Sequence, residues 1–181
     1  MINKDKTILI FSISLFFLMI VNIILFIRVI KLENQINEIF TPPEEIGLEI
    51  GKKVPDFKLL DINEKEVSLK DLNDKKLLLI FTTVGCSPCI ELYDDIKEFE
   101  NKHKDINIAI IVNGPLEYIK KILEDYNFSS LVLNDKERLT LKSYKVNSFP
   151  FANLIDENNI LINKGTVNNI DDLEELLNIA K

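Results

Sequence analysis

Residues 76–89, which read KLLLIFTTVGCSPC, decide the fold of this chain. Residues 76–84 form an apolar, β-prone run, which predicts a strand buried on both faces. Beyond the run, apolar side chains recur at steps of three and four, which predicts a helix over residues 86–103 with its buried stripe at Cys89, Leu92, Tyr93, Ile96 and Phe99. The segment is therefore read as a strand that turns into a helix at Cys86.

Cys86 and Cys89 are the two cysteines of the chain. A thiol at the start of a helix meets unpaired backbone N–H groups and the positive end of the helix dipole, and both favour the reactive thiolate. We expect Cys86 to attack, and Cys89, one turn further in, to be the more buried resolving thiol. Gly85, Ser87 and Pro88 complete the predicted active-site loop, and proline in a first helical turn costs no backbone hydrogen bond.

Three other interpretations of the cysteine pair compete with the redox one. Zinc needs four ligands, or three and a water, but the chain has no further cysteine, and its one histidine, His103, falls at the far polar end of the helix, where we expect a solvated side chain. Two thiolates suit a soft copper ion, which leaves a metal-binding module as a non-enzymatic alternative. A purely structural disulfide would close a very short loop and stabilise little. The redox interpretation calls for no cofactor and no metal.

The N-terminal part of the chain predicts a membrane anchor. Residues 7–27 contain no charged residue, and as a helix they would be about 31 Å long, which matches a bilayer core. The span exceeds the apolar region of a cleaved signal and lacks a small-residue cleavage site. We expect a short cytoplasmic stub at 1–6, the anchor at 7–27 and a stalk or linker at 28–50, in which Thr41-Pro42-Pro43 ends the helix.

Charge divides along the same boundary. Residues 1–40 carry 4 basic and 3 acidic side chains, whereas residues 41–181 carry 18 basic and 26 acidic ones, a net charge of −8. An acidic domain repels a polyanion, which disfavours nucleic acid as a partner. Positive charges flank the span on both sides, with a slight bias to a cytoplasmic N-terminus, and a disulfide-forming pair is most useful outside the cytoplasm.

The remaining residues, 51–181, alternate between strand and helix patterns. Strands are expected at 54–61, 66–69, 76–84, 107–112, 130–133, 151–155 and 160–164, and helices at 86–103, 116–126, 136–145 and after a cap at Asn169. This order predicts an α/β fold, with a mixed central sheet and helices on both faces.

The Cys-x-x-Cys helix, followed by Ser148-Phe149-Pro150 and a hydrophobic strand, resembles the thioredoxin superfamily. The resemblance implies a cis bond between Phe149 and Pro150, in a loop that lies against the active-site disulfide. It also implies that Phe149, Pro150 and Thr83 shape a substrate groove.

The front of the domain resembles a narrower group. Residues 51–57 and 67–72 are similar to the opening of membrane-anchored TlpA/ResA-type oxidoreductases and of AhpC/TSA-like peroxiredoxins, and residues 47–51 with 82–89 are most similar to the MauD-like branch. The resemblance covers residues 47–181. It implies a thioredoxin-like domain with an N-terminal β-hairpin extension, held by a single-pass anchor on the extracytoplasmic side of a bacterial cell membrane. It further implies cysteine-containing exported proteins or peptides as clients, and a membrane redox partner that supplies or removes electrons.

Several positions depart from these families. Gly85 replaces the tryptophan of thioredoxin, Ile80 its buried acid, and Leu92 the acidic residue of ResA-type proteins. Glu91 or water remain the candidates for handling the proton of Cys89. Thr83 matches the threonine of peroxiredoxins, but Leu79 replaces their proline, so a thiol peroxidase is the enzymatic alternative.

Overall fold

The computed structural model describes residues 4–39, 46–126 and 129–178, which belong to two compact units, Met1–Pro42 and Pro43–Lys181. The first unit contains helix α1, Lys4–Ile39. Its segment Ser12–Lys31 has a mean hydropathy of 2.7 and is long and apolar enough to cross a membrane. The predicted helix end at residues 41–43 lies outside the described residues.

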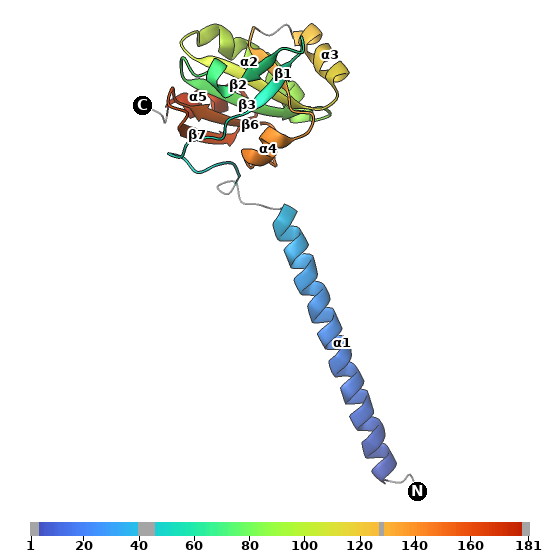
Figure 1. The fold of residues 1–181 in the computed structure, drawn as a ribbon. Helices are drawn as coiled ribbons and strands as arrows, with labels where there is room; N and C mark the ends of the chain where they lie inside the picture. Colours follow the sequence, from blue (N-terminus) through green and yellow to red (C-terminus); the bar gives the residue numbers. More distant parts are fainter. Residues whose placement is uncertain (1–3, 40–45, 127–128, 179–181) are drawn as a thin grey trace. The chain divides into compact units, whose positions relative to one another are not determined.

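The second unit is built on a seven-stranded mixed sheet in the order β2-β1-β5-β4-β3-β6-β7 (Figure 1). Strands β3, β4 and β5 run parallel, and the others pair antiparallel. The strands are β1 (Lys58–Asp61), β2 (Glu66–Ser68), β3 (Leu77–Thr83), β4 (Asn107–Asn113), β5 (Leu131–Asn134), β6 (Phe151–Ile155) and β7 (Leu161–Thr166). The predicted α/β architecture is confirmed.

Helices cover both faces of the sheet. Helices α2 (Ser87–Lys102), α3 (Leu116–Tyr126) and α5 (Ile170–Asn178) contribute to one hydrophobic core, which the apolar stripe of α2 fills. On the opposite face lie the short helix α4 (Leu139–Ser143), the 3-10 turn Leu69–Asp71 and the segment before β1. All five side chains of the predicted α2 stripe are buried.

Strand β3 is apolar throughout because it separates these two cores. Leu78 and Ile80 face the core under α2, whereas Leu77, Leu79 and Phe81 face the other core, and all five are fully buried. A strand with both faces covered needs a continuous apolar run rather than an alternating one. The run therefore predicted the centre of the sheet correctly.

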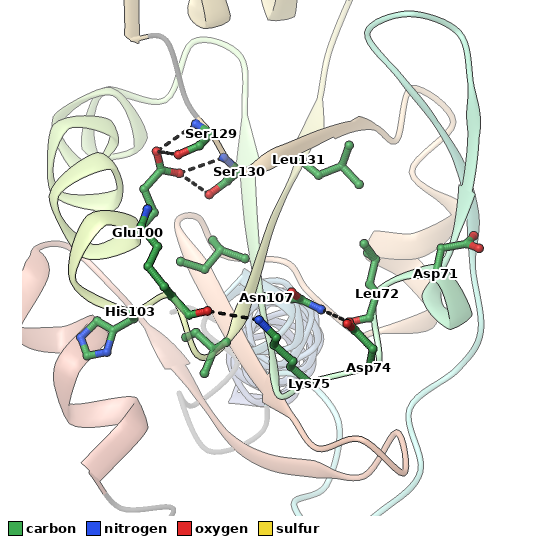
Figure 2. Close-up of a pocket in the computed structure, with 13 residues that line it drawn as sticks. Asp71, Leu72, Asp74, Lys75, Glu100, His103, Asn107, Ser129, Ser130 and Leu131 are labelled. Carbon is green, nitrogen blue, oxygen red and sulfur yellow. Dashed lines mark hydrogen bonds between the residues drawn. The ribbon is translucent and has the colours of Figure 1, made fainter.

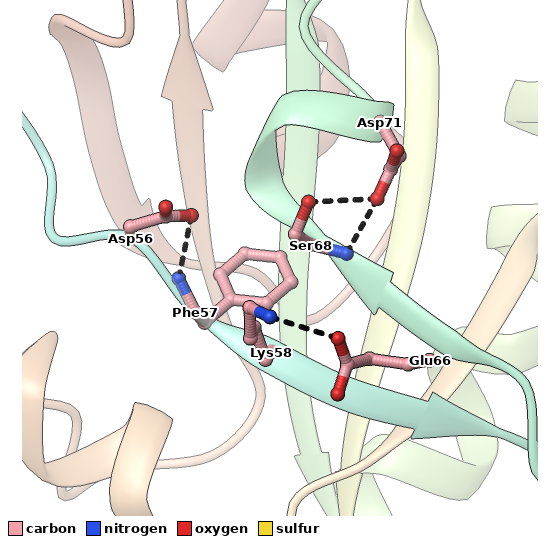
Figure 3. A network of polar contacts seen from close by, with 6 residues as sticks. All are labelled: Asp56, Phe57, Lys58, Glu66, Ser68 and Asp71. Atoms are coloured by element: carbon pink, nitrogen blue, oxygen red, sulfur yellow. Dashed lines mark hydrogen bonds and ion pairs between the residues drawn. The ribbon is translucent and has the colours of Figure 1, made fainter.

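The N-terminal hairpin, β1 and β2, extends the sheet beyond β5. Lys58 and Glu66 form an exposed ion pair of 2.9 Å across it, and the carboxylate of Asp71 accepts from both the N–H and the hydroxyl of Ser68 (Figure 3). The predicted strand over 54–61 began too early. Of its first four residues, Val54 and Phe57 pack against the core, but none joins the ladder, since β1 starts at Lys58.

The helix predicted over 136–145 was too long. Arg138 has a left-handed backbone with φ of 58°, and α4 begins only at Leu139. The buried carboxylate of Asp135 accepts from the N–H groups of Leu139, at 2.9 Å, and Leu141, at 2.8 Å. A side chain that satisfies free N–H groups in this way fixes the start of a helix, because those groups have no partner within it.

Candidate active site

The cysteine pair lies where β3 ends and α2 begins. Cys86 is the N-cap residue of α2, and it forms a disulfide with Cys89 at a Cα–Cα distance of 5.3 Å. The sulfur of Cys86 also accepts from the N–H of Cys89 at 3.2 Å, which satisfies one of the free donors at the helix start. Cys86 is half-buried, whereas Cys89 is fully buried in the core under α2. Solvent and any larger molecule therefore meet Cys86 first.

Gly85, Ser87 and Pro88 lie at the junction of β3 and α2. Gly85 has φ of 82° and is exposed, and a Cβ added there would meet nothing within 4 Å. Its glycine is therefore required by the backbone and not by crowding. Ser87 and Pro88 occupy the first turn of α2 and are exposed beside the disulfide.

A second segment approaches the disulfide from the start of β6. The Phe149–Pro150 bond is cis, as the resemblance implied, and Pro150 is buried. The carbonyl oxygen of Phe149 lies 3.9 Å from the sulfur of Cys86. The Phe149 ring is half-buried and packs against both hydrophobic cores. The structure thus brings Phe149 and Pro150 to the cysteine pair.

Thr83, the last residue of β3, is oriented differently. Its hydroxyl donates to the carbonyl of Asn113 on β4 at 3.1 Å. By the alternation of β3, its side chain leaves the face of the sheet opposite to that of Cys89. This commitment to a main-chain carbonyl does not favour the peroxidase alternative, in which Thr83 was the matching residue.

Apolar residues occupy both positions at which related families carry an acid. Ile80 and Leu92 are fully buried in the core that contains Cys89, and Glu91 is exposed on α2. Among the described residues, no three His, Cys, Asp or Glu side chains form a group that could hold a metal ion. The buried carboxylates among the described residues are those of Asp61, Glu100 and Asp135, and each accepts hydrogen bonds from residues outside the redox site.

Two hydroxyls that sequence reasoning missed are buried in this region. Tyr93 lies one helical turn after Cys89, and its phenol donates to the hydroxyl of Thr82 on β3 at 3.1 Å. Thr82 is fully buried and Tyr93 is 1% exposed, and this burial raises the pKa of Tyr93. The signal was available: Thr82 is a polar residue in a buried strand, and Tyr93 is a polar tip in the α2 stripe.

A cavity of about 380 Å³ lies at the far end of α2, away from the cysteines (Figure 2). Its polar groups are paired among themselves: both carboxylate oxygens of Glu100 accept from Ser129 and Ser130, and Asn107 donates to Asp74. The first set of contacts joins the end of α2 to the start of β5, and the second joins the start of β4 to the turn before β3.

His103 lies at this end and corrects one expectation. We expected a solvated side chain, but its Nε2 lies 2.9 Å from the carboxylate of Glu174 on α5, and its ring packs on Phe99 at a centroid distance of 4.3 Å. The histidine is half-buried because α5, distant in sequence, packs beside α2. It takes no part in the redox site.

Comparisons with known proteins agree with this geometry. The sequence pattern of the Redoxin family matches residues 49–179. The thiol-disulfide oxidoreductase ResA of Bacillus thuringiensis subsp. konkukian is 32% identical over 126 residues, which cover 68% of this chain and 72% of ResA. The methylamine utilization protein MauD of Paracoccus versutus is 26% identical and covers 75% of this chain and 68% of its own.

Solved structures show the same architecture. The thioredoxin domain of a thiol-disulfide oxidoreductase from Bacteroides vulgatus superposes with a TM-score of 0.65 at 26% identity, and covers 72% of this chain and 96% of its own. The family pattern covers residues 49–179, which contain the whole sheet and the Cys-x-x-Cys helix of this chain. This chain belongs to the Redoxin family, and it is a thioredoxin-like thiol-disulfide oxidoreductase.

Proposed function

We propose that this protein is a membrane-tethered oxidoreductase in which Cys86 attacks and Cys89 resolves. The observation that carries the proposal is the unequal exposure of the two sulfurs: Cys86 is accessible at the start of α2, whereas Cys89 is 0% exposed. Only the accessible sulfur can meet a client disulfide in a direct displacement. The buried one can act only after the first bond has formed.

In the reducing direction, the thiolate of Cys86 attacks one sulfur of a client disulfide, and the other client sulfur leaves as a thiolate. The thiolate of Cys89 then attacks the sulfur of Cys86, releases the second client thiolate and closes the Cys86–Cys89 disulfide. Two electrons pass to the client. A membrane redox partner returns two electrons to the protein, and the same steps in reverse would donate a disulfide.

Helix α1 supports the tether, because Ser12–Lys31 is long and apolar enough to span a bilayer. We place residues 1–6 in the cytoplasm, the anchor at 7–27, a stalk at 28–50 and the domain at 51–181 outside. Cysteine-containing exported proteins or peptides are the proposed clients, since disulfides persist outside the cytoplasm. Phe149 and Pro150 are proposed to line the client groove, with Gly85, Ser87 and Pro88 as the loop beside it, whereas the hydroxyl of Thr83 is bonded to Asn113 and Thr83 is not assigned to the groove.

Trapping of mixed disulfides tests the mechanism. Membranes from cells that express the full chain as Cys89→Ser should accumulate client adducts on Cys86, visible on non-reducing gels and absent in Cys86→Ser. The doubly substituted chain is the control for non-specific bands. Adducts that form equally well on Cys89 in Cys86→Ser would show that the roles are wrong, and full turnover in Cys89→Ala would exclude the two-cysteine mechanism.

Labelling of the reduced protein in intact cells tests its orientation. A membrane-impermeant maleimide should modify Cys86 of the wild-type chain without cell lysis, because the domain is placed outside. Labelling that requires lysis would place the domain in the cytoplasm and remove the basis for exported clients.

A further inference from the structure

The segment of residues 46–57, here called the strap, precedes the sheet and is fastened along its β7 edge. The N–H of Gly51 donates to the carbonyl of Leu161 at 2.8 Å, and the N–H of Leu161 donates to the carbonyl of Lys52 at 2.9 Å. These bonds make the strap a short additional pairing partner for the start of β7. Its position is therefore fixed by the sheet as well as by its buried apolar side chains, among them Ile46, Val54 and Phe57.

The strap also holds the connection that leads to the cis proline. The N–H of Gly47 donates to the carbonyl of Lys145 at 3.1 Å, and the phenol of the fully buried Tyr144 donates to the carbonyl of Pro55 at 2.7 Å. Two points of the strap are thus hydrogen-bonded to the chain five and six residues before Pro150. A shift of the strap would therefore move the segment that leads to Pro150.

Gly47 makes the closest approach. It is buried with φ of 81°, and a Cβ built on it would lie 3.0 Å from the ring atoms Cε1 and Cζ of Phe151 and 3.1 Å from Cδ of Lys164. The ammonium of Lys164 in turn donates to the carbonyl of Ile46 at 2.6 Å, and burial lowers the pKa of this lysine. The strap backbone therefore lies directly on the side chain that follows Pro150.

These contacts continue to the redox site. Phe151 is 1% exposed and directly follows Pro150, and the carbonyl of Phe149 lies 3.9 Å from the sulfur of Cys86. We propose that the strap positions the Phe149 carbonyl against Cys86, and that Gly47 is the positioning residue. The inference rests on the proposed function of Cys86 as the attacking thiol, and it gives residues 46–51, which the mechanism leaves unused, a part in the reactivity of that thiol.

The chain offers a matched pair of variants to test this. Gly47→Ala and Gly51→Ala both place a methyl group at a left-handed position, with φ of 81° and 82°, but only the first methyl presses on Phe151, since a Cβ at Gly51 meets nothing within 4 Å. Backbone strain is therefore equal in the two variants, and pressure on the Phe149–Phe151 segment differs. The full chain, reduced and in detergent micelles, is reacted with iodoacetamide at neutral pH, and modification of Cys86 is followed by mass spectrometry.

A carbonyl next to a thiol accepts its proton and stabilises the neutral form. Displacement of the Phe149 carbonyl should therefore raise the alkylation rate of Cys86 in Gly47→Ala, by about threefold or more, because the thiolate is the reacting species. Gly51→Ala should react at the wild-type rate. An equal rise in both variants would trace the effect to backbone strain and overturn the proposal, as would wild-type rates in both folded variants.

A second variant keeps the test decisive if Gly47→Ala does not fold. Lys164→Met retains the aliphatic stem but removes the bond to the Ile46 carbonyl, and should raise the rate in the same direction, while the exposed Lys52→Met should not. A wild-type rate in Lys164→Met would then overturn the proposal. Alkylation of Cys86 needs no client. Failure of client trapping would therefore contradict the proposed function but would leave the measured alkylation rates unaffected.

Discussion

The buried pair of hydroxyls beside the resolving cysteine gives a sharp prediction about stability. Tyr93→Phe keeps the ring, which packs on Tyr126 at a centroid distance of 5.2 Å, and removes the phenol that donates to Thr82. Thr82 is fully buried, so its hydroxyl loses that partner where water cannot replace it. A buried polar group left in this state costs about 1–3 kcal/mol, and we expect a loss of that size in the free energy of unfolding.

The assay is urea unfolding of the oxidised full chain in detergent micelles, followed by near-ultraviolet circular dichroism. Thr82→Val is nearly isosteric, and the double variant Tyr93→Phe/Thr82→Val removes both hydroxyls. The double variant should therefore lose about 1 kcal/mol less unfolding free energy than the sum of the losses in the two single variants. Tyr118→Phe, at a 52% exposed tyrosine, is the control and should change stability by less than about 0.5 kcal/mol. Single effects that add to within about 0.3–0.5 kcal/mol would refute the pairing.

Two further predictions concern the frame of the site. Burial alone would raise the pKa of Glu100, but the hydroxyl and N–H donors of Ser129 and Ser130 outweigh it and hold the pKa below its ordinary value. The stability that this carboxylate contributes should be complete above about pH 4.3 and should be lost as the pH falls through the lowered pKa of the folded state. The difference in unfolding free energy between wild type and Glu100→Gln should therefore shrink in acid. A difference that stays constant with pH would contradict this. A Cβ on Gly114 would lie 2.4 Å from Cγ2 of Val84, so Gly114→Ala should lower the unfolding free energy measured in urea. Adding Val84→Ala to this variant should restore part of the lost stability. No recovery in the double variant would show that the clash is not the cause.

The centre of the fold could be predicted because local sequence and tertiary environment agree there. The apolar run of β3 matches a strand buried on both faces, and the α2 stripe from Cys89 to Phe99 matches the side it buries. The start of α2 at the cysteines also follows from local chemistry, since the Cys86 sulfur accepts a backbone N–H. Each of these features depends on neighbours within one or two turns.

The sequence-based predictions were wrong or incomplete where contacts between segments distant in sequence determine the structure. α4 is shorter than its pattern because the Asp135 carboxylate fixes its start, and His103 is half-buried because α5 packs beside it. The buried pairing of Tyr93 with Thr82 joins a helix to a strand, and the contact of Gly47 with Phe151 joins residues about a hundred positions apart. No pattern within a window of one element contains such contacts.

The environment of Cys89 differs from that of Cys86 in a way that bears on the order in which the two thiols are proposed to react. Ile80 and Leu92 belong to the same buried hydrophobic core as Cys89, and Glu91 is exposed on α2. Burial among apolar groups disfavours a charged thiolate. The helix start, by contrast, favours charge on Cys86. The two thiols that the proposed mechanism assigns to attack and resolution therefore differ in environment: Cys86 is half-buried at a positive helix end, and Cys89 is fully buried among apolar side chains.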